Sequence, residues 1–381
     1  MTAQTFKVAV VGPSRVGKTT LLTAILSDTN RMLAGTPVSV AMDEATEKRV
    51  SVQRKELRRA IEAQEFNPAA LEGNQQIVHY HVSLRAAGDE ALEIPFDILD
   101  YPGGWLDPAK RADVPHAQQR WPQCERHIED SVMLLVPIDS AVLMEAVTPA
   151  HRRAVPDLLG LEDTEAMVRK WARSRNREEH RQEPAVLVLA PMKCEKYFDD
   201  NGGTGRDAGR LRATIRAKYA NVLEIVREEA QDRPVRIVYA PIDTYGCVEL
   251  MDTEWVDDGS GQLLFRGHYR FRGNPPRISV KAAGSVMQQL CGCLIDGRDA
   301  AEAENLAGYR VGVRNLLDRH AQPKGFWGTL GYHLGGEAAE NRRDRTYLGG
   351  QIDAATRRRI QLTEAVEKLA KMPQDQRIEE W

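Results

Sequence analysis

The feature that most constrains this chain is a glycine-rich loop directly after a short apolar strand near the N-terminus. Residues 6–11 (FKVAVV) are typical of a buried parallel strand. Residues 12–19 (GPSRVGKT) match the pattern GxxxxGK[ST], and residues 20–26 (TLLTAIL) carry the single apolar stripe of a helix. A strand, this loop and a helix in that order predict a phosphate-binding loop rather than a chance match.

The spacing of this loop has a chemical reason. Gly12 and Gly17 allow backbone N–H groups and the helix N-terminus to face a β-phosphate. We expect Lys18 to reach the β- and γ-phosphates and the Thr19 hydroxyl to bind Mg²⁺. The residues predicted to bind the nucleotide phosphates are Gly12, Ser14, Arg15, Val16, Gly17, Lys18, Thr19 and Thr20.

A second motif ends a predicted β-hairpin. Residues 76–85 and 92–99 are predicted to be antiparallel strands joined by the polar turn 86–90. The second strand leads into residues 100–103 (DYPG), which match the DxxG pattern of a GTPase switch II. We expect Asp100 to hold Mg²⁺ through a water and the Gly103 amide to sense a γ-phosphate.

Two later loops are predicted to bind the base. Residues 190–195 (APMKCE) follow a predicted strand at 185–189, where GTPases carry their guanine-reading NKxD loop. We expect Lys193 to stack its stem on the base and Glu195 to accept hydrogen bonds from guanine N1 and N2. Met192 replaces the usual Asn or Thr and Glu195 is longer than Asp, so ATP binding or weak base selectivity stays open.

The fifth loop of the GTPase pattern is a weaker indication. It follows the predicted last core strand, 235–239, and its backbone at Pro241 and Ile242 is expected to touch the base.

Catalysis needs a group that stabilises the charge growing on the transferred phosphoryl group. Many GTPases place a Gln after DxxG to orient water, but here Gly104 and Trp105 follow. Arg15 is the predicted substitute, as an internal arginine finger over the γ-phosphate, and the alternative is an arginine directed to solvent or to a carboxylate. The predicted catalytic residues are Arg15, Lys18 and Gly103.

Switch I is predicted within residues 28–75, where a Thr should close on Mg²⁺. Thr36 is the first candidate, and Thr29 and Thr46 compete with it. The predicted metal ligands are therefore Thr19, Thr36 and Asp100. Residues 44–63 within this region are predicted to form a charged amphipathic helix.

These motifs resemble a known family. The order of elements over about residues 6–296 is similar to translation-factor-related P-loop GTPases. The segments GPSRVGKT and LDYPGGWLD look most like YcjX-type bacterial stress GTPases, and some relation to GTPases of bacterial conflict systems is expected. The resemblance implies binding of GTP or GDP with Mg²⁺ and, after the last core strand, a hairpin (here 255–266) and a helix (here 278–296).

Composition excludes several other classes. The 381 residues carry 52 Lys and Arg against 55 Asp and Glu, so a net charge of −3 predicts no nucleic-acid partner. Five scattered cysteines never form CxxC, which argues against disulfide scaffolds and thiolate zinc sites. No apolar run approaches the ~20 residues of a membrane span. His79 and His81 share a strand face, but the sequence places no third metal ligand with them.

The combined prediction is an α/β P-loop NTPase fold. It has a mostly parallel sheet with one antiparallel strand from the hairpin, helices on both faces and a C-terminal helical extension. Residues 1–250 form the core, 251–320 the hairpin insertion and closing helices, and 321–381 a Gly/aromatic segment and a last helix at about 353–371. We expect this tail to fold back on the core, with docking on a protein or a membrane surface as the alternative.

The predicted function is a cytoplasmic, slow GTP-hydrolysing switch whose loops report nucleotide state to a protein partner. A nucleotide-binding scaffold with negligible turnover is the alternative. Peripheral membrane contact and a nucleotide-dependent homodimer stay open.

Overall fold

The strand before the glycine-rich loop lies inside an eight-stranded sheet. The computed structural model describes residues 5–63, 66, 76–86, 93–180, 183–201, 203, 205–230, 234–259, 261–311 and 354–381. Within that part of the chain the strand order is β10-β7-β6-β5-β1-β4-β3-β2. The strands are β1 (Phe6–Val10), β2 (Val38–Met42), β3 (Val78–Ala86), β4 (Glu93–Asp100), β5 (Met133–Asp139), β6 (Val186–Met192), β7 (Arg236–Tyr239) and β10 (Glu379–Glu380).

The sheet is mostly parallel, as predicted. Strands β4, β1, β5, β6 and β7 all run in one direction. The antiparallel strand predicted from the hairpin is β3, and a second described strand that was not predicted, β10, also runs against the others. Neither β10 nor β2 was predicted, because β10 has only two residues and β2 is an edge strand of five residues, both too short to give a clear apolar periodicity.

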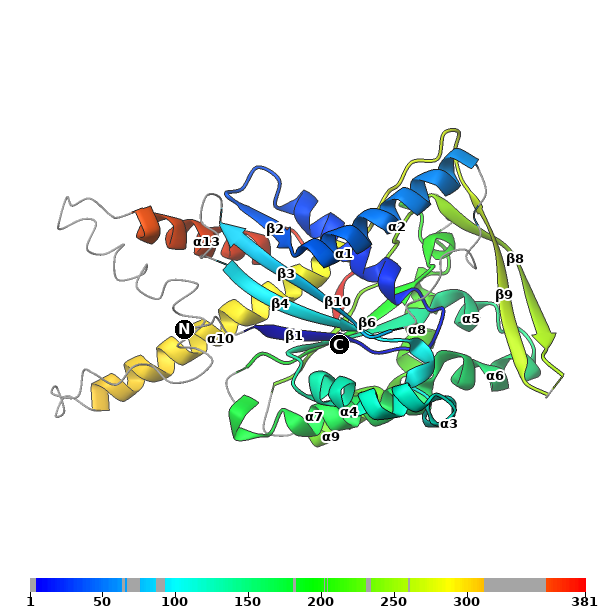
Figure 1. Cartoon of the computed structure of the whole chain (residues 1–381), viewed down its shortest axis with the longest axis horizontal. Helices are drawn as coiled ribbons and strands as arrows, with labels where there is room; N and C mark the ends of the chain where they lie inside the picture. Colours follow the sequence, from blue (N-terminus) through cyan, green and yellow to red (C-terminus); the bar gives the residue numbers. More distant parts are fainter. Residues whose placement is uncertain are drawn as a thin grey trace.

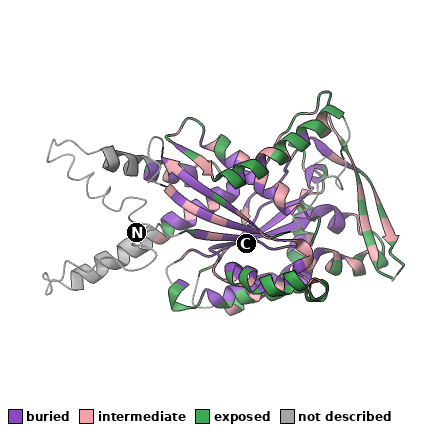
Figure 2. Cartoon of the chain, in the orientation of Figure 1, coloured by how far each residue is buried: buried purple, intermediate pink, exposed green. Residues whose placement is uncertain are grey.

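Helices cover both faces of the sheet (Figure 1). One face carries α1 (Lys18–Met32), α10 (Ala283–Val311) and α13 (Ala354–Ala370). The other carries α4 (Pro115–Glu129), α7 (Leu161–Ser174), α8 (Ala208–Lys218) and α9 (Ala220–Glu229). The buried residues of both layers gather along the sheet (Figure 2).

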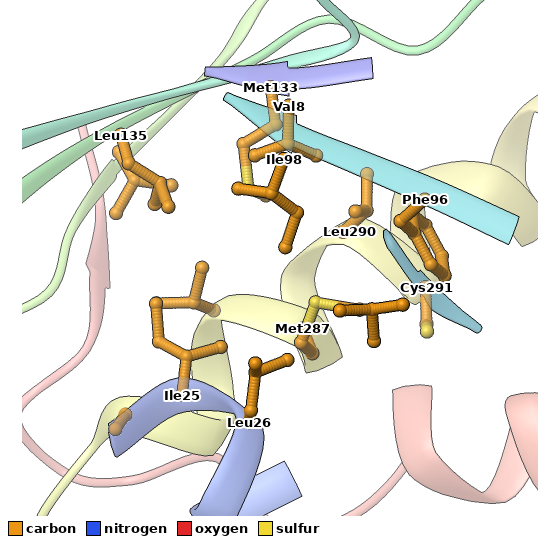
Figure 3. Packing of buried hydrophobic residues seen from close by; sticks show 14 of the residues in the cluster. Val8, Ile25, Leu26, Phe96, Ile98, Met133, Leu135, Met287, Leu290 and Cys291 are labelled. Carbon is orange, nitrogen blue, oxygen red and sulfur yellow. The ribbon is translucent and has the colours of Figure 1, made fainter. Parts of the chain in front are cut away.

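Strand alternation divides the core into two clusters. Val8 and Val10 face the first cluster, whereas Ala9 and Val11 face the second. In Figure 3, side chains of the sheet lie against those of α1 and α10: Val8, Ile98 and Leu135 against Ile25, Leu26, Met287 and Leu290.

The predicted helices exist, but two are divided. The many charged residues over 148–177 predict one helical region, but the structure has two helices there, α6 (Pro149–Leu159) and α7, because Gly160 between them has a left-handed φ of 56°. The sequence also predicts one helix over about 207–230, and the structure has two, α8 and α9, which meet at Tyr219. The charged helix predicted over residues 44–63 is α2 (Glu44–Ala63).

The remaining elements connect this framework. Two short helices, α3 (Pro108–Ala112) and α5 (Ser140–Met144), follow β4 and β5. The hairpin after β7 is longer than predicted, with β8 at Val248–Asp257 and β9 at Leu263–Phe271. None of the described helices combines the length and apolar character of a membrane span.

The end of the chain belongs to the core. Leu362, Val366 and Leu369 of α13 are buried in the first cluster, and burial of each such side chain stabilises the fold by about 1.5–3 kcal/mol. After α13 the chain adds β10 to the edge of the sheet beside β7. The Gly/aromatic segment 324–336 lies outside the described residues.

Candidate functional site

The glycine-rich loop lies at the carboxyl end of β1 and leads directly into α1. Gly17 has a φ of 101° and is the N-cap of α1, a conformation that suits glycine. Arg15 also has a left-handed φ, 63°, which costs a non-glycine residue about 1–3 kcal/mol. A Cβ added to Gly12 would lie 3.1 Å from the Pro137 side chain of β5. The loop is therefore a strained turn packed on the next strand.

Lys18 folds back into this turn. Its Nζ donates to the carbonyl oxygens of Gly12 and Pro13, both at 3.0 Å, and the side chain is buried. Burial lowers the pKa of Lys18 to about 8, although the charge of Asp100 acts in the opposite direction. A buried ammonium held by two neutral acceptors is poised to exchange them for phosphate oxygens.

Thr19 and Asp100 meet across the end of the sheet. The Thr19 hydroxyl donates to Asp100 Oδ2 at 2.9 Å, and Asp100 is 1% exposed. A hydroxyl and a carboxylate are the hard oxygen donors that Mg²⁺ prefers, so these two residues fit the ion that a P-loop uses. The structure brings both predicted ligands together although 81 residues separate them.

Gly103 packs directly on the loop. A Cβ added to Gly103 would lie 2.3 Å from Ser14 N and 2.5 Å from Pro13 O. A backbone contact this close excludes every side chain. Movement of either segment must therefore be transmitted to the other.

Lys193 connects the predicted base-binding loop to the same turn. It forms an ion pair with Asp139 at the end of β5, and its Nζ also lies 3.5 Å from the Arg15 carbonyl oxygen. Lys193 has a left-handed φ of 55°. The carboxyl ends of β1, β5 and β6 are thus joined through one lysine.

Glu195 is covered rather than presented to solvent. It is 7% exposed, and burial together with the charge of Asp243 raises the pKa of its carboxyl to about 8. The Gly246 amide and the Arg272 charge act in the opposite direction. In this conformation a base cannot reach the Glu195 carboxylate without movement of the loop that follows β7.

The fifth loop does not offer its backbone as predicted. Pro241 has no N–H, and the Ile242 amide donates to the Pro191 carbonyl oxygen at 2.7 Å. Ile242 is fully buried. The Ile242 amide extends the pairing of β7 with β6 and is therefore not available to a base in this conformation.

Thr36 lies at the opposite end of the sheet from Asp100. The register pairs Val38 with Ala86, whereas Asp100 pairs with Val78. Eight strand residues at about 3.3 Å each separate these ends by roughly 26 Å. The Thr36 hydroxyl instead donates to the Leu33 carbonyl at 2.7 Å, so its prediction as a Mg²⁺ ligand is not met here.

Neither competing threonine replaces it. Thr29 lies ten residues beyond Thr19 on α1, about 15 Å along the helix. The Thr46 hydroxyl is fully buried and accepts from the His81 amide at 3.0 Å. No threonine in the described part of residues 28–75 meets Thr19 and Asp100.

The remaining loop residues lie around the turn. Ser14 and Arg15 are exposed, Val16 is buried, and Arg15 forms no ion pair with any residue that the structure describes. The Thr20 side chain contacts Tyr245 of the β7–β8 connection.

Sequence reasoning missed two groups at this site. Tyr101 lies beneath Lys18, with its ring centroid 5.6 Å from Nζ. Arg377 near the C-terminus reaches the buried Asp243, at 2.8 Å. Tyr101 was visible inside the DxxG motif, but no local pattern connects Arg377 with Asp243 across the chain.

Comparisons with known proteins name no relative. No family model and no curated protein matches this chain.

Proposed function

We propose that this chain is a P-loop GTPase that binds GTP or GDP with Mg²⁺, hydrolyses GTP slowly and reports its nucleotide state to a protein partner. The carrying observation is that Lys18, the Thr19–Asp100 pair and Gly103 converge on one turn. Each of the three has the chemistry that polyphosphate binding requires: a buried cation, hard oxygen donors and a close backbone contact. A cytoplasmic location belongs to the same proposal.

The protein residues have separate roles in this proposal. Lys18 leaves the Gly12 and Pro13 carbonyls and donates to the β- and γ-phosphates. Mg²⁺, held by Thr19 and Asp100, neutralises charge on the phosphate oxygens when bound. The contact between Gly103 and the Pro13–Ser14 peptide carries the change at the loop into switch II.

Arg15 is the proposed charge-stabilising group for the transferred phosphoryl. It is exposed beside the loop, and its left-handed backbone holds the turn in a strained conformation. A guanidinium folded over the γ-phosphate supplies charge in cis, at a position where no Gln follows Gly103.

A second candidate, binding of ATP or of both bases, is favoured by the covered Glu195. A carboxyl whose pKa is raised to about 8 is largely protonated at pH 7 and accepts poorly from guanine N1 and N2. GTP selectivity therefore requires the β7–β8 connection to open and Glu195 to ionise.

Titration calorimetry of GTP, GDP and ATP into the full chain with Mg²⁺ tests the proposal. We expect GTP and GDP to bind at least tenfold more tightly than ATP. Binding of ATP alone would remove the guanine assignment, and binding of none of the three would reject the nucleotide proposal. Nucleotide binding without release of phosphate would instead favour the alternative function, a nucleotide-binding scaffold with negligible turnover.

A further inference from the structure

A second cluster of chemically active side chains lies away from the nucleotide loop. His79 of β3, Asp97 of β4 and His127 of α4 place their ligand atoms within 4.8 Å of one another. His79 Nδ1 is 2.8 Å from Asp97 Oδ1, and His127 Nδ1 is 3.8 Å from Asp97 Oδ2. Three elements thus contribute one donor each.

The ring of His127 is oriented for coordination. Its Nε2 lies 3.2 Å from the Val8 carbonyl oxygen of β1, and because a carbonyl only accepts, Nε2 carries the hydrogen. Burial lowers the pKa of His127 to about 4, so the ring is neutral and Nδ1 bears a lone pair at pH 7. This arrangement, with one ring nitrogen donating to a backbone carbonyl, is typical of metal-binding histidines.

In the metal-free protein two hydrogen-bond acceptors of this cluster lie next to each other. The unprotonated Nδ1 of His127 lies 3.8 Å from Asp97 Oδ2, and both atoms are hydrogen-bond acceptors. Although burial acts to raise it, the hydrogen bond from His79 and the neighbouring histidines hold the pKa of Asp97 below its ordinary value. A cation between Asp97 and His127 would satisfy both groups.

The cluster is open to solvent on one side. His79 and His127 line a cavity of about 310 Å³, together with Lys7, Leu99, Cys124 and Asp130. An ion and its waters can enter there. Asp97 precedes Asp100 by three residues on β4, about 10 Å along the strand, so the cluster is separate from the Mg²⁺ ligands.

We propose that His79, Asp97 and His127 form a binding site for a divalent transition-metal ion such as Zn²⁺. Ligand atoms on a tetrahedral Zn²⁺ lie about 3.3 Å apart. His79 Nδ1 is 2.8 Å from one Asp97 oxygen, His127 Nδ1 is 3.8 Å from the other, and the ligand atoms of the three residues lie within 4.8 Å of one another, so the side chains must shift to close on the ion. Two imidazoles and one carboxylate suit Zn²⁺ better than Mg²⁺ or Ca²⁺.

The ion would join α4 to the neighbouring strands β3 and β4. His81 pairs with Asp97 across the strands, and its Nδ1 lies 3.8 Å from Asp97 Oδ1. It is the nearest further donor, and water from the cavity fills the remaining position. Bound metal would thereby fix α4 against β3 and β4.

Zinc titration of the full chain tests the site, after removal of any affinity tag and of bound metal. Two variants change a ligand with little change in volume: His79→Gln and Asp97→Asn. His116→Gln is the matched control, because it removes an exposed histidine from α4, the helix that also carries the ligand His127. Circular dichroism establishes that each variant is folded.

We expect one Zn²⁺ per chain, a rise in Tm on binding, and affinity weakened more than about tenfold by either ligand variant but unchanged by His116→Gln. Absence of zinc binding by the wild type would overturn the proposal. Wild-type affinity in both ligand variants would do so too. Independently of the variants, Co²⁺ bound to the wild type should lack a thiolate charge-transfer band, and a strong band would assign the ion to cysteine.

Discussion

Replacement of Gly103 by alanine should break the contact between the segment that follows β4 and the glycine-rich loop. The new Cβ would lie 2.3 Å from Ser14 N and 2.4 Å from Pro13 C, whereas ordinary contacts begin at 3.4 Å. The two backbones must therefore separate by about 1 Å. Overpacking of this kind costs about 1–3 kcal/mol, which corresponds to about a 5- to 140-fold change in an equilibrium constant.

Gly104→Ala is the matched control for this substitution. Its Cβ would lie 3.7 Å from Ser14 Oγ, an ordinary contact, and Gly104 has no left-handed φ. Urea unfolding and titration with a fluorescent GTP analogue measure stability and affinity for both variants. We expect Gly103→Ala to lose about 1–3 kcal/mol of unfolding free energy and to bind GTP more weakly, while Gly104→Ala matches the wild type within about 0.5 kcal/mol. Equal behaviour of the two variants would refute the role assigned to this contact.

Three further predictions address other parts of the account. Arg15→Ala should slow GTP turnover by at least tenfold with GTP affinity changed less than about threefold, as measured by phosphate release, and equal rates would reject the finger. Because burial and Asp243 raise the pKa of Glu195 from 4.5 to about 8, the folded state holds that proton more tightly, so stability should fall as pH rises through this range. Denaturation at pH 5, 7 and 9 should show that the unfolding free energy of the wild type falls with pH and that this dependence is lost in Glu195→Gln. The same pH dependence in both proteins would contradict the assignment. Arg377→Ala should cost about 3–5 kcal/mol by leaving Asp243 buried without its cation, whereas Arg212→Ala, at an exposed ion pair, should cost about 1 kcal/mol or less, and similar losses in thermal unfolding would oppose this reading.

Local patterns predicted much of the fold. The strands at 78–86 and 93–100 and the helix at 44–63 follow from apolar periodicity and lie where that periodicity predicts them. The breaks at Gly160 and Tyr219 were missed because polar helices on both sides continue the same pattern. Strand β10 could not be predicted, since two residues carry no periodicity and pair only because α13 returns the chain to β7.

The residues of the candidate site also fall into those that a local motif predicts and those that it does not. Lys18, Thr19 and Asp100 were predictable because each stands in a motif whose spacing the chemistry sets. Thr36 was placed by counting residues, and the edge strand β2 takes it to the far end of the sheet. The third member of the histidine cluster, His127, comes from α4, and no strand pattern indicates which helix residue will lie above Asp97.

The central claim is that the turn beginning at Gly12 binds a polyphosphate through Lys18. The direct measurement is calorimetric titration of GTP, with and without Mg²⁺, into the wild type, Lys18→Met and the control Lys371→Met, which removes an exposed lysine directly after the end of α13. We predict Mg²⁺-dependent binding by the wild type and by Lys371→Met, and at least a tenfold loss in Lys18→Met. Equal GTP affinity in all three proteins, or no binding by any of them, would contradict the account.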